Sequence, residues 1–172
     1  MSRIGTMKDS VYKEMRKSLG LTRADVCERA ILLGKPLQPE RLERIENNKF
    51  PITPEEVLIL SEIYNEPTLW NCYCTRECPI GKDYVRPIQV KDLAQIVLEM
   101  LSSLNSVKKS RERLIEITAD GVISDDELKD FIFIQNELSH ISDTVQTLQA
   151  WVDKMLADGK INLQKYNELK KD

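Results

Sequence analysis

The sequence contains few glycine, proline and aromatic residues. Its 172 residues include six glycines and seven prolines, and 6% of the residues are aromatic. A loop-rich β protein of this length carries roughly twice as much glycine plus proline. Charged residues make up 31% of the chain, against an average of roughly 25%. These proportions favour an all-α protein with long, solvent-exposed helices.

Long apolar runs are absent as well. The sequence has no window of about eighteen apolar residues, the length that a membrane-spanning helix needs. The opening MSRIGTMKDS lacks the basic-then-apolar pattern of a secretion signal. We therefore expect a cytoplasmic protein with no membrane segment. In that compartment the four cysteines are expected to be reduced thiols or metal ligands rather than disulfides.

Histidine, the commonest general base, occurs once, as His140. We find no nucleophile–base pair, phosphate-binding loop or dinucleotide fingerprint in the sequence. The expectation is that the chain is not an enzyme.

The net charge of −3 hides an uneven distribution along the chain. Residues 1–86 contain 14 basic and 13 acidic side chains, whereas residues 87–172 contain 11 basic and 15 acidic ones. Residues 8–50 alone contain ten basic and seven acidic side chains. Because positive charge is concentrated near the N-terminus, the overall charge does not exclude a nucleic-acid partner.

The first part of the chain has the signals of short helices separated by turns. We expect helices over residues 8–19, 22–32, 40–47, 54–64 and 68–74. Thr22 with Asp25, and Thr53 with Glu56, have the spacing of N-terminal capping boxes. Helices of this length do not persist alone, so they are expected to pack into a bundle. The residues expected to form its core are Met15, Leu19, Leu21, Val26, Ala30, Leu42, Ile45, Val57, Leu60 and Ile63.

The second part has a different pattern, with apolar residues recurring at steps of three and four. This 3.5-residue repeat is typical of a coiled-coil seam or an antiparallel helical hairpin. The expected seam residues are Leu93, Val97, Met100, Leu104, Val107, Leu114, Phe131, Ile134, Leu138, Ile141, Val145, Leu148, Val152 and Met155. We expect two helices of about 28 and 32 residues, each over ~40 Å long, joined at Gly121, and a short last helix after Gly159.

These patterns divide the chain into three parts. Residues 1–78 form the predicted bundle, residues 79–90 a connector that contains proline and follows the cysteines, and residues 91–172 the hairpin with its last helix. We expect the hairpin to mediate oligomerisation or another protein interaction.

Two segments of the bundle carry a family resemblance. The segment MRKSLGLTRADVCE at residues 15–28 and the segment LERIENNK at residues 42–49 resemble the lambda-repressor-like (Xre/Cro) helix-turn-helix family. The resemblance covers about residues 8–75. It implies a five-helix bundle that binds double-stranded DNA as a transcriptional regulator, in a bacterium or a mobile element.

The resemblance also implies site residues. Backbone phosphates require cations and free helix N-termini, and base edges require bidentate polar side chains. Thr22 and Arg23 are expected to meet phosphate, Gln38 and Arg41 to reach base edges, and Arg44 and Lys49 to lie along the phosphates.

The sequence also departs from the family pattern. About five additional residues separate Val26 from Ile45, and Glu40 and Glu43 would border a phosphate-rich groove. The alternative interpretation is a protein-interaction adaptor whose helix-turn-helix-derived bundle does not bind DNA, with the hairpin docking on another helical protein.

Cys72, Cys74 and Cys78 lie within seven residues at the end of the bundle. With Cys27 as a distant fourth ligand they could hold Zn²⁺ or an iron–sulfur cluster, which would make the protein a thiol- or metal-responsive regulator. Buried cysteines can equally fill the junction as ordinary thiols. We expect no cofactor and keep the metal as the alternative.

The sequence therefore predicts a DNA-binding transcriptional regulator, in the first instance a repressor. It would act as a homodimer through its C-terminal helices, so that two reading helices meet half-sites about 34 Å apart.

Overall fold

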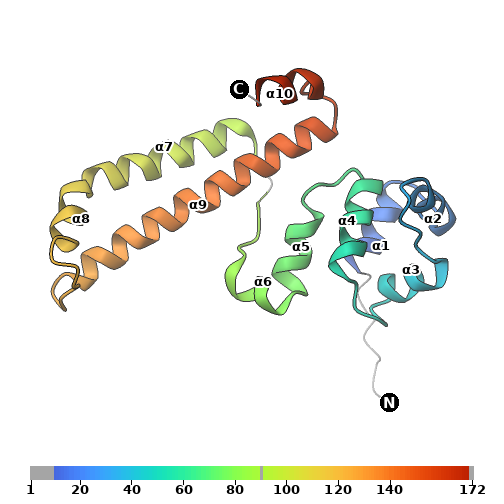
Figure 1. Cartoon of the computed structure of the whole chain (residues 1–172), viewed down its shortest axis with the longest axis horizontal. Helices are drawn as coiled ribbons and strands as arrows, with labels where there is room; N and C mark the ends of the chain where they lie inside the picture. The colour runs from blue at the N-terminus through green and yellow to red at the C-terminus, as the bar shows by residue number, and fades with distance from the viewer. Residues whose placement is uncertain (1–9, 90, 171–172) are drawn as a thin grey trace, which may run out of the picture. The chain divides into compact units, whose positions relative to one another are not determined.

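The computed structural model describes residues 10–89 and 91–170, and every regular element in them is an α-helix (Figure 1). The expectation of an all-α chain is confirmed. The helices form two compact units. One unit contains the residues up to Pro87 together with those from Ala157 onward, and the other contains Ile88–Leu156.

The first unit begins with four short helices close to the predicted ranges. They are α1 (Val11–Ser18), α2 (Arg23–Leu32), α3 (Pro39–Glu46) and α4 (Pro54–Ile63). Both predicted capping boxes are present, at Thr22 with Asp25 and at Thr53 with Glu56. Ser10 caps α1 by accepting a hydrogen bond from the Lys13 amide. The predicted start of the first helix, at residue 8, lies outside the described residues.

The core of these helices is largely the predicted one. Its fully buried members share the inward faces of α2, α3 and α4: Val26, Ala30, Leu42, Ile45, Val57, Leu60 and Ile63. Leu19, which we expected to pack inward, is 48% exposed. Leu37 is buried, so the lengthened segment between α2 and α3 is held to the core by one of its own side chains.

Two further helices, α5 (Leu69–Arg76) and α6 (Pro79–Tyr84), follow in the first unit. The predicted connector is thus helical in its first half. Cys78 caps α6 through its sulfur, and Pro79 occupies the first turn, where proline's missing N–H costs nothing. A six-residue helix is too short to show an apolar period, which is why the pattern did not reveal it.

Glycine at position 81 allows α5 and α6 to approach closely. A Cβ atom at Gly81 would lie 2.2 Å from the carbonyl oxygen of Cys74. A side chain of any size at this position would force the two backbones apart.

We therefore expect Gly81→Ala to destabilise the first unit by about 1–3 kcal/mol, the usual cost of overpacking. Urea unfolding followed by circular dichroism measures this loss. The control is Lys82→Ala, which changes the exposed neighbouring residue. Equal stabilities of the two variants would contradict the close approach of α5 and α6.

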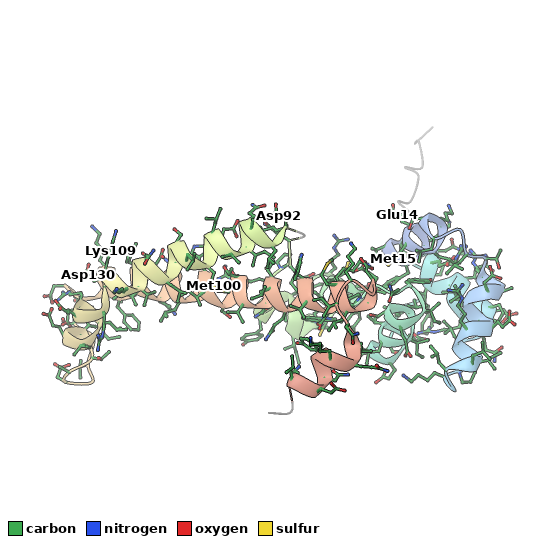
Figure 2. All side chains as sticks on the ribbon, turned by 90° about the horizontal axis from the view of Figure 1, so that it is seen from above. Glu14, Met15, Asp92, Met100, Lys109 and Asp130 are labelled. Atoms are coloured by element: carbon green, nitrogen blue, oxygen red, sulfur yellow. The ribbon has the colours of Figure 1, made fainter. Side chains whose placement is uncertain are left out.

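The second unit is an antiparallel hairpin. Its first arm is α7 (Leu93–Lys109) followed by α8 (Arg111–Ile117), and its second arm is α9 (Leu128–Ala157), whose last residue is grouped with the first unit. Figures 1 and 2 show the two arms side by side; Figure 2 labels Asp92 and Lys109, which mark the ends of α7. Arg113 Nε of α8 pairs with Asp130 Oδ2 of α9 at 2.7 Å.

Two predictions about the hairpin need correction. The first arm is not one continuous helix, because it is interrupted at Ser110, whose amide donates to the carbonyls of Ser106 and Val107. The long second helix is confirmed at 30 residues. The short last helix is α10 (Leu163–Leu169), capped by Asn162; it is grouped with the first unit rather than with the hairpin.

The seam of the hairpin agrees with the predicted one at nine of fourteen positions. Ile134 is buried, and eight others are half-buried: Met100, Val107, Leu114, Phe131, Ile141, Leu148, Val152 and Met155. Val97, Leu104, Leu138 and Val145 are between 38% and 47% exposed. The less exposed positions precede them by one residue: Ile96 and Thr144 are buried, and Ser103 and Glu137 are half-buried. At these four positions the less exposed residue is the one before the predicted seam residue, and Leu93 is also exposed.

Among the described residues, no helix combines the length and the apolar character that a membrane span requires.

Candidate nucleic-acid interface

A buried carboxylate joins α1 to α2 and α3, the two helices in or beside which the candidate residues lie. Glu46, near the end of α3, is completely buried. Arg16 of α1 donates from Nη2 to Glu46 Oε2 at 2.9 Å and from Nε to Oε1. Arg23 of α2 donates from Nε to Glu46 Oε2 at 2.8 Å. We call these three residues the Glu46 cluster.

The Glu46 cluster also reaches the turn between α1 and α2. Arg16 donates from Nη1 to the carbonyl oxygen of Leu21 at 2.7 Å. The residue that caps α2, Thr22, follows directly. The cluster therefore fixes the N-terminus of α2 relative to the end of α3.

The electrostatics of the cluster favour the ionised carboxylate. Burial raises the pKa of Glu46, but the hydrogen bonds and charges of Arg16 and Arg23 outweigh burial and bring the pKa below its usual range. Two cations around one buried anion leave no uncompensated negative charge there.

The structure places Thr22 and Arg23 at the start of α2, as predicted. Thr22 is exposed, and its hydroxyl accepts the Asp25 amide at 3.1 Å. Arg23 is turned towards the protein, with its side chain 32% exposed and bonded to Glu46. Its contribution is therefore structural first, and any phosphate contact must use the outer edge of its guanidinium.

Gln38, Arg44 and Lys49 are exposed around α3. Gln38 occupies the N-cap position without a side-chain capping bond. Within the described part of the chain, neither Arg44 nor Lys49 pairs with an acidic side chain. These three side chains are available to a ligand.

Arg41 is held in a second charged cluster. Its Nε and Nη2 donate to the two carboxylate oxygens of Glu56 at 2.6 and 2.7 Å, and Nη2 also donates to the carbonyl oxygen of Pro51 at 2.8 Å. The guanidinium lies over the Phe50 ring, 4.7 Å from its centre. The role expected for Arg41 at base edges would require breaking this bidentate pair.

Sequence reasoning missed Arg16 and Glu56, the partners of these clusters. Glu56 was noticed only as a capping residue, which it also is, because it accepts the Thr53 amide at 2.9 Å. The available signal for Arg16 was its position. It is an arginine that follows Met15 on a side of the first helix that otherwise faces inward, within reach of a buried acid.

Acidic residues share the exposed surface of α3. Glu40 and Glu43 are both exposed, and Glu43 lies 3.9 Å from Arg23 Nη1, which is a weak contact. The surface therefore carries mixed charge rather than a uniform basic patch.

The cysteines do not converge. Cys72 and Cys74 are two residues apart on α5, so they project about 200° apart around the helix. Burial raises the pKa of both thiols, which disfavours the thiolate that a metal requires. Cys78 accepts the Gly81 amide at 3.4 Å. In the part of the chain that the structure describes, no three His, Cys, Asp or Glu side chains could hold a metal ion together.

Comparison with models of protein families, with curated proteins and with solved structures found no match to this chain.

The Glu46 cluster predicts a specific pH dependence. Because the folded-state pKa of Glu46 is lowered, its contribution to stability is present above the ordinary glutamate pKa of about 4.3 and is lost as pH falls through the lowered value. Glu46→Gln should cost about 3 kcal/mol at pH 7. The difference from the parent protein should shrink towards pH 3.

Urea unfolding at a series of pH values measures both curves. Glu40→Gln is the matched control, since it changes an exposed glutamate on the same helix and should leave stability and its pH dependence unchanged. If Glu46→Gln loses stability in acid as steeply as the parent, the carboxylate does not carry the effect.

Proposed function

We propose that the chain is a DNA-binding transcriptional regulator of the lambda-repressor-like helix-turn-helix type, acting as a homodimer through its C-terminal helices. The observation that carries the proposal is the Glu46 cluster. It clamps α1, α2 and α3 together from the inside while Thr22, Gln38, Arg44 and Lys49 remain exposed.

Each exposed group has a role that suits duplex DNA. The N-terminus of α2 offers backbone N–H groups to a phosphate. Arg44 and Lys49 supply cations for neighbouring phosphates. Gln38 can donate to and accept from one base edge, a pairing suited to adenine.

DNA binding by this surface predicts a steep dependence on salt. Each neutralised phosphate adds about 0.9 to the slope of log affinity against log salt. Arg44→Ala and Lys49→Ala should each reduce that slope by about 1, and together lower affinity at least tenfold. The measurement is fluorescence anisotropy with a duplex selected from a genomic DNA pool, between ~50 and ~200 mM salt.

Lys129→Ala is the control, because Lys129 is an exposed cation of the hairpin outside the proposed surface. An affinity that is unchanged in the Arg44, Lys49 double variant would rule out this surface. Absence of any binding at ~50 mM salt would rule out the DNA-binding function itself.

A second candidate function is a protein-interaction adaptor. Two observations favour it: Glu40 and Glu43 lie on the exposed surface of α3, and Ile31 and Leu32 at the end of α2 are 63% and 81% exposed. The affinity for such a partner would depend little on salt, and the Leu32→Asp variant would lose it. The salt slope therefore distinguishes the two functions.

A further inference from the structure

The hairpin exposes a group of large apolar side chains on both of its arms. Val97, Leu101 and Leu104 of α7 are 41%, 52% and 46% exposed, and Leu138 and Val145 of α9 are 47% and 38% exposed. We call these five residues the hairpin face.

Helix geometry puts the five side chains on the same side of the hairpin. Each follows a less exposed seam position by one residue, as Val97 follows Ile96 and Val145 follows Thr144. One residue is a rotation of about 100°. Because the arms are antiparallel, that rotation turns both rows towards the same side.

The Arg113–Asp130 ion pair sets the level of the two rows. Counting from that pair along each arm at about 1.5 Å per residue, Leu104 reaches the level of Leu138, and Val97 reaches that of Val145. The hairpin face is therefore one continuous patch rather than two separate rows.

The inner seam contains polar residues beside its apolar ones. Several inward positions are polar or small: Ser103, Ser110, Glu137 and Thr144. A helix in a bundle usually has an apolar stripe at least about 100° wide, which faces more than one neighbour. Here the stripe continues onto the hairpin face, where a second layer of helices would bury it.

The chemistry of the hairpin face suits another copy of itself. Its five residues and Ser142, which shares the face, are uncharged. Residues 88–156 contain seven basic and twelve acidic side chains, yet none of those charges stands among these positions. Two copies related by a two-fold axis would thus bring no like charges together at the centre of the contact.

The hairpin face has the size of the apolar centre of a dimer interface, and surrounding residues would form its polar rim. α7 has 17 residues and is therefore about 25 Å long, and two adjacent helices are about 20 Å wide. The face thus covers on the order of 500 Å² in projection, and its accessible area is larger. A standard stable interface buries about 800 Å² per partner.

We propose that a second copy of this chain packs on the hairpin face, so that two hairpins form a four-helix bundle. The inference names the contact surface of the dimer in the proposed function, and it does not require that the protein bind DNA.

The test is light scattering on the full chain after size exclusion, at concentrations from ~1 to ~100 µM. The parent protein is expected to be a dimer. Leu104→Glu with Leu138→Glu should weaken association at least a hundredfold and give a monomer. Phe133→Glu is the control, because Phe133 is 51% exposed on the opposite flank of the seam, and this variant should stay dimeric.

Circular dichroism checks that the variants remain helical. If the double glutamate variant unfolds, Leu101→Gln with Val145→Gln is the milder pair, and it should weaken association at least tenfold. A parent protein that is monomeric at ~100 µM would overturn the proposal, as would folded variants that associate like the parent.

The failure of this proposal is distinguishable from the failure of DNA binding. The hairpin-face variants should bind a half-site with the salt slope of one bundle. Arg44→Ala with Lys49→Ala should lose DNA and remain dimeric. An unchanged oligomer in the hairpin-face variants would contradict the dimer surface alone. Loss of association in the Arg44, Lys49 variant would show that the two surfaces are not separate.

Discussion

The arrangement of the first unit depends on one buried carboxylate. Glu46 is inaccessible to solvent, and it is tolerated there because Arg16 and Arg23 satisfy it from two other helices. Short helices of eight to ten residues have little stability of their own. A charge that must be paired has one acceptable geometry, whereas apolar side chains tolerate several. The Glu46 cluster thus specifies how α1, α2 and α3 meet, in addition to what it contributes to stability.

The same constraint determines which side chains are left for a ligand. Arg23 is committed to Glu46, and Arg41 is committed to Glu56, so two of the six predicted DNA contacts serve the fold first. Among the predicted contacts, and within the residues that the structure describes, the cations that remain uncommitted are Arg44 and Lys49. Under the proposed function, Glu40 and Glu43 beside them would weaken the attraction of one bundle for DNA, because carboxylates within a Debye length of a phosphate repel it.

How much the sequence could reveal depends on whether the signal was local. Thr22 with Asp25 and Thr53 with Glu56 marked helix starts correctly, because a capping box is a contact between residues three positions apart. The Arg16–Glu46 pair spans thirty residues of sequence, and no local pattern announces it. The seam was predicted correctly at most positions and missed at others for a different reason: both Ile96 and Val97, and both Thr144 and Val145, are compatible with a 3.5-residue repeat. Only the partner helix decides which of two adjacent positions turns inward.

That error has a physical meaning for the proposed dimer. The apolar stripe of each arm is wider than the row between the arms. Ile96 and Ile134 are buried, while Leu104 and Leu138 remain exposed. If the hairpin face binds a second copy, the second DNA-binding bundle acts intramolecularly, at an effective concentration on the order of millimolar. In such a dimer, two surfaces of mixed charge would together reach an affinity that neither reaches alone.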